Sequence, residues 1–399
     1  MEAGARSGTS GAERGLHAHG DRGLQGPLLY LSDAQDGLGV VLNRCALYGG
    51  LSAGSGRTML RPGIIAPPEN RTDTLIVRII GDVMLHTRQM ETALRADGTF
   101  DFSPFLSGIS ERLRSADIAV AGMEFTLAGK PYTGYPSFSA PDSYADYVAD
   151  CGVDVFLTAN NHILDKGARG LERTLRYYAG MENAGTVRYT GCEMPGDAQR
   201  NPLILKVKGV KIAIVNCTYG TNAGGEVAGG ARVVRMDDVG AMIAAARASG
   251  ADMVLVCPHW GAEYTLRHGR EQELWARRMA DWGADIIVGA HPHVVQDREV
   301  IEVSDGRRVP VYYSIGNAVS NMSARNTQLG LIVEVRIIRD ALGNVALDGT
   351  SGEWIWCTLP GDLSRSYQVV PVDGCPAREQ WLRPAAYDKM LSTMSRVIE

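Results

Sequence analysis

Residues 75–82 read Leu-Ile-Val-Arg-Ile-Ile-Gly-Asp, and the rest of the chain can be interpreted outward from this stretch. A β-branched run that ends in Gly-Asp is typical of a buried strand followed by a turn. Similar short apolar runs occur at residues 118–121, 153–158, 212–216, 253–257 and 286–288. Such runs are typical of strands in a sheet that is covered on both faces.

Helical patterns lie between these runs, at about residues 104–115, 142–150, 168–184, 237–249 and 270–283. The alternation predicts crossover units and an α/β sheet that is at least partly parallel. After about residue 297 the pattern changes, because residues 299–303, 309–314 and 329–338 follow one another as strands joined by turns. We expect these strands to form an antiparallel element that closes the fold.

The chain divides into three parts on composition. Residues 1–72 are rich in Gly, Ala, Arg and Ser, which predicts an unstructured tail, and Met59 could begin a shorter chain. Residues 73–340 hold the alternating pattern and form the predicted main domain. Residues 341–399, with four prolines and a last helix near 385–398, are predicted to be an appendage that packs on this domain.

Composition excludes several classes of partner and location. With 40 basic and 45 acidic residues and no basic run, the chain lacks the clustered charge that a nucleic acid requires. The longest apolar run has 8 residues, at 239–246, whereas a membrane helix needs about 20. Without a recognisable secretion signal the sequence predicts a cytoplasmic protein. Association with the cell surface becomes the expectation if the N-terminus is misassigned.

Polar residues that can bind metals directly follow five of the predicted strands. In α/β sheets, loops at the carboxyl ends of strands converge on a rigid edge, so we expect these residues to lie together. The candidates are Asp82, Glu124, Asn161, His162, His259, His291 and His293. The seven cysteines are scattered without a C-x-x-C pair, so neither a disulfide scaffold nor a thiolate zinc site is expected.

This donor set points to a particular class of cofactor. Imidazole nitrogens with carboxylate and amide oxygens suit Mn, Fe, Zn or Ni better than a calcium cage or an iron–sulfur cluster. A carboxylate can bridge two cations, and two metals about 3.5–4 Å apart clamp the attacking and leaving oxygens of phosphoryl transfer. The pattern therefore predicts two divalent metals and hydrolysis of a phosphate ester.

Each candidate has a structural explanation when it is taken alone. Gly-Asp and Asn-Asn are common in turns, and a single buried histidine is more often a hydrogen-bonding residue than a ligand. His291-Pro-His293 is more specific, because an H-x-H pair places both imidazoles on the same side of an extended segment. Five such strand ends together favour a site over a set of coincidences.

The same residues carry a family resemblance that covers about residues 75–320. The segments at 81–84, 159–165, 259–264, 289–293 and 313–317, together with Glu124, resemble those of the CapA-type capsule-biosynthesis (poly-γ-glutamate synthesis) proteins. That family resembles a branch of the calcineurin-like metallophosphoesterases. The resemblance implies an α/β fold of two packed β-sheets flanked by helices.

The resemblance also implies a role for each candidate. Asp82 would bind one metal and Glu124 would bridge the two, Asn161 and His259 would bind the second, and His291 and His293 would each take one metal. His162 would protonate the leaving group, and we infer that Asp165 orients it. Hydrolysis by metal-activated water of a phosphorylated small molecule or an anionic polymer follows, in contact with the capsule-synthesis machinery.

One position departs from the broader superfamily. Its first motif is Asp-x-His, and here the histidine position is Met84, so the first metal loses a ligand; His86 has the wrong spacing for direct replacement. The departure leaves enzymatic activity open, although we favour an enzyme. One alternative is a non-catalytic polymer-binding or assembly factor for capsule synthesis. Another is an amide hydrolase that acts on polyglutamate.

Overall fold

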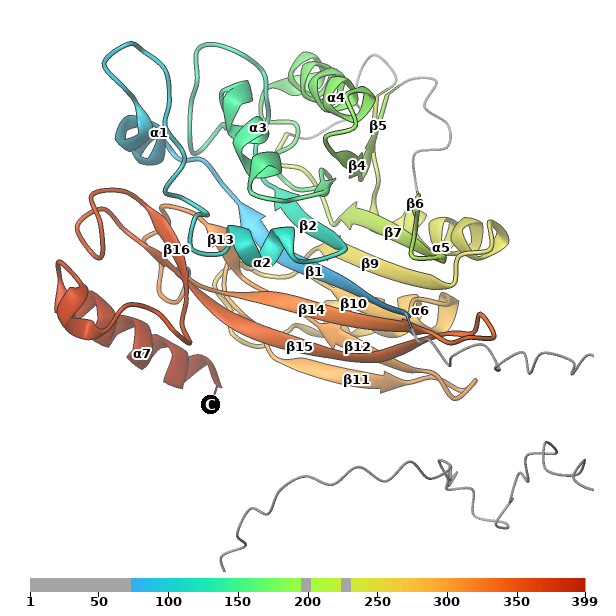
Figure 1. Ribbon diagram of the computed structural model, residues 1–399. Helices are drawn as coiled ribbons and strands as arrows, with labels where there is room; N and C mark the ends of the chain where they lie inside the picture. The colour runs from blue at the N-terminus through green and yellow to red at the C-terminus, as the bar shows by residue number, and fades with distance from the viewer. Residues whose placement is uncertain (1–72, 195–201, 224–230, 399) are drawn as a thin grey trace, which may run out of the picture. The chain divides into compact units, whose positions relative to one another are not determined.

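The computed structural model describes residues 73–194, 202–223 and 231–398, all of which belong to one structural unit (Figure 1). The tail predicted at residues 1–72 lies outside this described part. Most of the strands lie in two large sheets, and the helices cover the outer faces of both (Figure 1).

The first sheet has eight strands and contains the segment at residues 75–82. Its order is β16 (Gln368–Pro371), β15 (Val345–Thr358), β14 (Leu329–Arg339), β1 (Asp73–Val83), β2 (Ile118–Met123), β3 (Val155–Leu157) and β4 (Arg188–Thr190), with β13 (Asn317–Val319) also beside β1. Strands β1 to β4 are parallel to one another, whereas β14, β15 and β16 pair antiparallel. The sheet is therefore mixed.

The second sheet has six strands. Its order is β11 (Arg298–Glu302), β12 (Arg308–Tyr312), β10 (Ile286–Val288), β9 (Met253–His259), β7 (Val210–Thr218) and β6 (Leu203–Val207). Strands β7, β9, β10 and β12 are parallel, and β6 and β11 pair antiparallel at the two edges. A separate pair is formed by β5 (Cys192–Glu193) and β8 (Arg232–Val233).

The helices form an outer layer on each side of the packed sheets. On the first sheet lie α1 (Thr87–Ala93), α2 (Ser110–Arg114), α3 (Asp142–Asp150) and α4 (Gly167–Asn183); on the second lie α5 (Val239–Ala248) and α6 (Arg270–Trp282). The short 3₁₀ helices are η1 (Met236–Asp238) and η2 (Arg378–Gln380), and α7 (Pro384–Ile398) closes the chain. The predicted helix at 104–115 is shorter than expected, since α2 has five residues.

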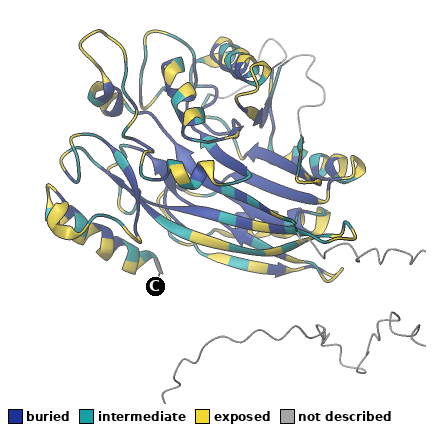
Figure 2. Ribbon diagram, viewed as in Figure 1, coloured by how far each residue is buried: buried dark blue, intermediate teal, exposed yellow. Residues whose placement is uncertain are grey.

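Three apolar layers hold these elements together. Alternate residues of β1, such as Leu75, Val77 and Ile79, pack between the two sheets against β7 and β9. The helices bury their apolar faces on the two outer sheet surfaces. Figure 2 shows the result, with buried strands inside and exposed residues on the outer sides of the helices. The predicted fold class, an α/β protein with two packed sheets flanked by helices, is confirmed.

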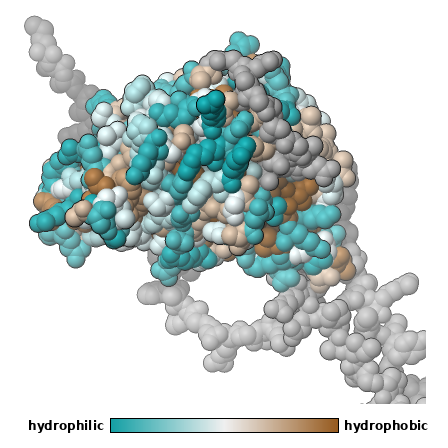
Figure 3. Space-filling model, turned by 90° about the horizontal axis from the view of Figure 1, so that it is seen from above, coloured by the Kyte–Doolittle hydropathy of each residue, from teal (hydrophilic) through white to brown (hydrophobic). Residues whose placement is uncertain are grey.

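The outer surface of the helices is polar. The face above α3 and α4, seen in Figure 3, is mostly hydrophilic, with apolar residues in separate patches. Arg173 of α4 makes an ion pair with Asp142 of α3 across this layer, with 2.7 Å between Nη2 and Oδ2. Burial on one side and solvation on the other is the amphipathic arrangement that the helical periodicity predicted.

The prediction of one antiparallel element after residue 297 is wrong. Strands β11 and β12 do form an antiparallel hairpin, but β12 then joins β10 of the second sheet in parallel, whereas β14 pairs with β1 of the first sheet. The chain therefore crosses from one sheet to the other between β12 and β14. Turn signals locate a strand but do not specify the sheet it enters.

Residues after 340 extend the first sheet. The β14–β15 hairpin pairs over eleven residues, and β16 pairs with β15. Helix α7 packs on the same strands through Trp356, Val370 and Met390. The part of the chain predicted as an appendage thus contributes two strands and a helix to the described unit.

Close backbone contacts position the end of β1. Asp82 donates its backbone N–H to the carbonyl of Gly316 (3.3 Å). A Cβ on Gly81 would lie 1.8 Å from that same carbonyl oxygen. Only glycine at position 81 therefore allows β13 to lie beside the strand that carries Asp82.

We predict that Gly81→Ala lowers the free energy of unfolding by about 1–3 kcal/mol, because the added methyl group overpacks against rigid backbone. Chemical denaturation followed by circular dichroism measures the change. Gly180→Ala is the matched control, since a Cβ at this exposed position of α4 meets no atom within 4 Å. The control should be neutral or stabilised. Equal stability of Gly81→Ala and the wild type would contradict the packing argument.

Candidate metal centre

All eight residues predicted from the sequence lie in one buried cluster at the carboxyl ends of β1, β2, β3, β9 and β10. The parallel strands of the two packed sheets end here, so their following loops face one another. The side chains of Asp82, Glu124, Asn161, His162, Asp165, His259, His291 and His293 are each connected to another member by a contact of at most 4.0 Å.

Two carboxylates form the centre of the cluster. Asp82, near the end of β1, and Glu124, which directly follows β2, are 1% and 0% exposed. Asp82 Oδ2 accepts the backbone N–H of His291 (3.1 Å). Asp82 Oδ1 and both oxygens of Glu124 have no hydrogen-bond partner among the described residues. Buried carboxylate oxygens without partners are costly, so a missing cationic partner is implied.

Asn161 and His259 form one side of the cluster. His259 is the last residue of β9, and its Nε2 lies 2.9 Å from Asn161 Oδ1. The same nitrogen lies 3.8 Å from Glu124 Oε1. These three donor atoms come from different strand ends but face a common point.

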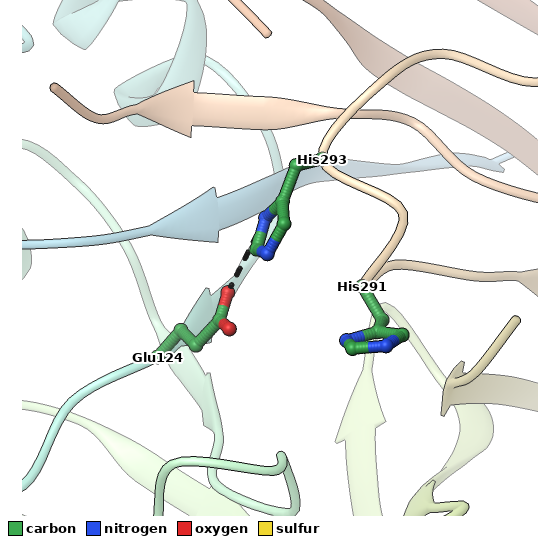
Figure 4. Close-up of side chains that lie close together, drawn as sticks. All are labelled: Glu124, His291 and His293. Atoms are coloured by element: carbon green, nitrogen blue, oxygen red, sulfur yellow. Dashed lines mark ion pairs between the residues drawn. The ribbon is translucent and has the colours of Figure 1, made fainter. Parts of the chain in front are cut away.

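His291 and His293 enter from the loop after β10, and Figure 4 shows both rings on the side of Glu124. The prediction that an extended segment delivers them is wrong, because the two residues have φ of +99° and +59°. Left-handed backbone is unfavourable for a residue with a Cβ, and it clusters at functional sites where surrounding structure enforces it. The His291 N–H bond to Asp82 is part of that enforcement.

His293 contacts both carboxylates. Its Nδ1 lies 3.5 Å from Asp82 Oδ2 and 3.8 Å from Glu124 Oε2, the second of which Figure 4 marks with a dashed line. His291 Nδ1 has no hydrogen-bond partner among the described residues. Glu124, His291 and His293 each offer one ligand atom, and these three atoms lie within 4.8 Å of one another.

These distances fit atoms that share a metal ion. Ligands at roughly 2.1 Å from an ion stand about 3.0 Å apart when adjacent and about 4.2 Å apart when opposite, by right-angled geometry. The contacts of 2.9–3.8 Å around His259 and His293 fall in this range. Together with the unpartnered oxygens and imidazole nitrogen, the donor set fits one or two divalent cations.

Burial and charge shift the pKa values of the cluster in opposite directions. Burial, and then the neighbouring Asp82, raises the pKa of Glu124 well above its usual range. Burial lowers the pKa of His291 to about 3 and that of His259 well below its usual value. At His293 burial acts downward, but the Glu124 and Asp82 carboxylates outweigh it and raise the pKa to about 9. Two neutral imidazoles are thus available as ligands near neutral pH.

His162 lies at the edge of the cluster with Asp165 behind it. His162 Nδ1 is 2.7 Å from Asp165 Oδ2, and His162 Nε2 is 3.9 Å from Glu124 Oε1. Asp165 Oδ2 also accepts the backbone N–H of Phe138, whose ring packs edge-on against the imidazole. Because a carboxylate only accepts hydrogen bonds, Nδ1 of His162 carries a proton and Nε2 faces the centre.

Sequence reasoning missed two asparagines of the cluster. Asn222 lies beyond β7, with its Nδ2 3.4 Å from His162 Nε2, and its Oδ1 accepts from Asn161 Nδ2 (3.4 Å). Asn317 Oδ1 lies 2.9 Å from His293 Nδ1. Asn222 could have been found by extending the strand-end rule to β7. Asn317 stands in the quoted segment at 313–317 but received no role.

Position 84 takes no part in the centre. Met84 is 1% exposed and packs in the apolar layer between the first sheet and its helices. His86 caps α1 and lies 3.1 Å from Gln89 Oε1 through its Nδ1, and burial lowers its pKa to about 4. Within the described part of the chain, the ion pairs of the two carboxylates involve neither residue, so this segment gives the first metal position no ligand beyond Asp82.

Comparison with known sequences establishes the family. The profile of the family described as "Bacterial capsule synthesis protein PGA_cap" matches residues 76–322, more than half of the chain. The chain therefore belongs to this family, and the predicted resemblance to CapA-type proteins is confirmed. The matched range includes every residue of the cluster.

Curated relatives agree with this assignment. The chain is 27% identical over 292 residues to "Capsule biosynthesis protein CapA" of Bacillus anthracis, covering 69% of this chain and 67% of the relative. It is 29% identical over 290 residues to "PGA biosynthesis protein CapA" of Bacillus subtilis (strain 168), covering 68% and 70%.

Solved structures with partial similarity include two nucleotidases. They are the 5′-nucleotidase precursor of Thermus thermophilus (TM-score 0.42, 14% identity, 82% of this chain and 59% of that chain) and the NAD nucleotidase of Haemophilus influenzae (0.45, 12%, 82% and 63%). The activity in each name belongs to that protein. Separately, none of the helices in the described ranges is both long and apolar enough to cross a membrane.

We predict that Glu124→Gln raises the free energy of unfolding of the metal-free protein by about 1–3 kcal/mol, because it removes a buried charge without partners. The same variant should lose most of the stabilisation by added Mn²⁺, which for a bound ligand is about 2.7 kcal/mol at 100 times Kd. Thermal unfolding with chelator and with Mn²⁺ measures both effects.

Glu334→Gln is the control for this prediction. Glu334 pairs with Arg78 (2.8 Å) on β14 and β1, outside the cluster, so this variant should keep the full response to Mn²⁺. A Glu124→Gln protein that is less stable than the wild type in chelator, or equally stabilised by Mn²⁺, would contradict the assignment.

Proposed function

We propose that the chain is a divalent-metal-dependent phosphoesterase-like enzyme that serves capsule or poly-γ-glutamate synthesis. The observation that carries this proposal is the convergence of unpartnered polar atoms from Asp82, Glu124 and His291 at the strand ends. The role in capsule synthesis comes from the names of the curated relatives. The chemistry comes from the donor set of the cluster.

Seven residues would hold the cofactor or act beside it. Asp82, Glu124 and His293 surround one position, while Glu124, Asn161, His259 and His291 surround the other. When bound, a divalent pair supplies Lewis acidity and an activated water. Glu124 is the only carboxylate of the set with both oxygens unpartnered, which suits a residue shared between two cations.

His162 is the proposed general acid. Its Nε2 faces the centre, and Asp165 holds the other ring nitrogen at 2.7 Å, so the ring is fixed in orientation. A proton on Nε2 can pass to a leaving oxygen without movement of the imidazole. Asp165 is in turn fixed by the N–H of Phe138. The phosphate ester would therefore lie with its leaving group toward His162.

A cavity beside the cluster offers room for the substrate. It has a volume of about 350 Å³ and is lined by Tyr219, Trp260, Arg270 and Trp275 among others. Tyr219 connects it to the centre, since its ring lies 4.7 Å from that of His291. Arg270 supplies a cation for an anionic substrate. The substrate class that fits is an anionic polymer or a phosphorylated small molecule.

A non-catalytic role in polymer binding or assembly is the second candidate. Met84 favours it, because the core burial of this side chain leaves the first metal position one ligand short of the superfamily pattern. Hydrolysis of an amide in polyglutamate would use the same cluster. Side-by-side assays with a phosphodiester, a phosphomonoester and poly-γ-glutamate separate the three roles.

We predict that His291→Ala abolishes both stoichiometric metal and hydrolysis of a model phosphoester, because the imidazole with a free Nδ1 is lost. Elemental analysis and a chromogenic phosphoester assay measure the two effects. His268→Ala is the matched control, because His268 stacks on Tyr313 and bonds Asp297 away from the cluster. Unchanged metal and activity in His291→Ala would refute the site.

We predict that His162→Gln lowers kcat about 10²- to 10⁴-fold, the usual contribution of a general acid, and leaves metal content unchanged. Asp165→Asn should cause a smaller loss, since it weakens only the orientation of the ring. Steady-state kinetics with matched metal analysis measure both. Loss of metal in His162→Gln would show instead that the imidazole is a ligand.

A further inference from the structure

Asn317 occupies a place in the fold that directly adjoins Asp82. Strand β13 lies parallel to β1, and the two residues are register partners in that pairing. Register partners of neighbouring strands carry their side chains to the same face of the sheet. Asn317 therefore points where Asp82 points, toward the cluster.

The orientation of the Asn317 amide is determined by its surroundings. Its Nδ2 is surrounded by acceptors, namely the carbonyls of Thr327 (3.0 Å) and His293 (3.4 Å) and Ser320 Oγ (3.1 Å). Because an amide nitrogen only donates, these contacts fix Nδ2 on the outer side. Oδ1 is left facing the centre, 2.9 Å from His293 Nδ1.

The position of Oδ1 matches that of a ligand adjacent to His293. His293 Nδ1 lies 2.9 Å from Asn317 Oδ1, 3.5 Å from Asp82 Oδ2 and 3.8 Å from Glu124 Oε2. Adjacent ligands of one ion stand about 3.0 Å apart when each is roughly 2.1 Å from it. An amide oxygen is also a ligand that Mn²⁺ and similar cations accept.

We propose that Asn317 Oδ1 ligates the first metal together with Asp82, Glu124 and His293, in place of the ligand that position 84 does not supply. This inference rests on the proposed function, since it assumes that the cluster holds metal. A neutral oxygen donor from β13 completes a position that would otherwise depend on three protein ligands. The first site would then favour harder cations than a site with a further imidazole.

The test measures metal affinity without any activity assay. Full-length wild type, Asn317→Ala and Asn317→Asp are dialysed against buffered Mn²⁺, and bound metal is determined by elemental analysis. We expect two equivalents in the wild type. In Asn317→Ala one of them should bind about 100-fold or more weakly, beyond the about 10- to 100-fold loss typical of an outer-shell partner. Asn317→Asp should retain both equivalents, because it keeps an oxygen at the same place.

A matched control and a spectrum separate ligation from positioning. Asn321→Ala alters an asparagine of the same segment whose Oδ1 accepts from Tyr367, so it should bind both equivalents normally. In Co²⁺-loaded protein, the visible d–d bands report the number of ligands. These bands should change in Asn317→Ala and return toward the wild type in Asn317→Asp.

The outcomes distinguish the two proposals. A wild type that binds no stoichiometric metal overturns the proposed function. A wild type with two equivalents and an Asn317→Ala variant with unchanged affinity and Co²⁺ bands overturns only the role of Asn317. If Asn317→Ala does not fold, Asn317→Asp still decides the question, since loss of the first metal in that variant contradicts an oxygen ligand at this place.

Discussion

The burial of two carboxylates, Asp82 and Glu124, among three imidazoles is the constraint on which the rest of this structure depends. Their oxygens lie at the ends of parallel strands, away from solvent, and three of the four lack a hydrogen-bond partner among the described residues. Such an arrangement is unfavourable unless a cation completes it. The close approach of β13 to β1 and the left-handed loop at 291–293 both serve to bring donors to this point.

The sequence predicted much of this arrangement because its signals are local. Apolar runs located strands such as β1 and β9, and the polar residues after them belong to the cluster. Parallel strands end at a common edge, so the strand-end rule sufficed to bring together residues as distant in sequence as Asp82 and His291. The helical periodicity likewise located α3, α4, α5 and α6 closely.

The remaining features depend on tertiary contacts that no local pattern encodes. The turn after β12 does not show that β14 pairs with β1 in the other sheet. The φ angles of His291 and His293 follow from contacts such as the bond to Asp82, so an extended segment was the wrong expectation. Asn317 became visible as a member of the cluster only through its pairing beside Asp82. Short polar residues in loops give no signal of their own.

Membership of the capsule-synthesis family and a buried donor set together suggest how one fold serves polymer synthesis. The apolar layers keep the sheets rigid, and the loops at one edge supply all the polar chemistry. Met84 shows that a ligand position can be lost to the core without loss of the surrounding cluster. The chemistry at this edge therefore depends on which residues replace it.

Anomalous diffraction above the manganese edge, from crystals of the full chain grown with Mn²⁺, tests the central claim most directly. The account predicts two peaks inside the protein, one bordered by Asp82, Glu124 and His293 and the other by Glu124, His259 and His291. Peaks confined to the surface, or an empty cluster in fully loaded crystals, would contradict it.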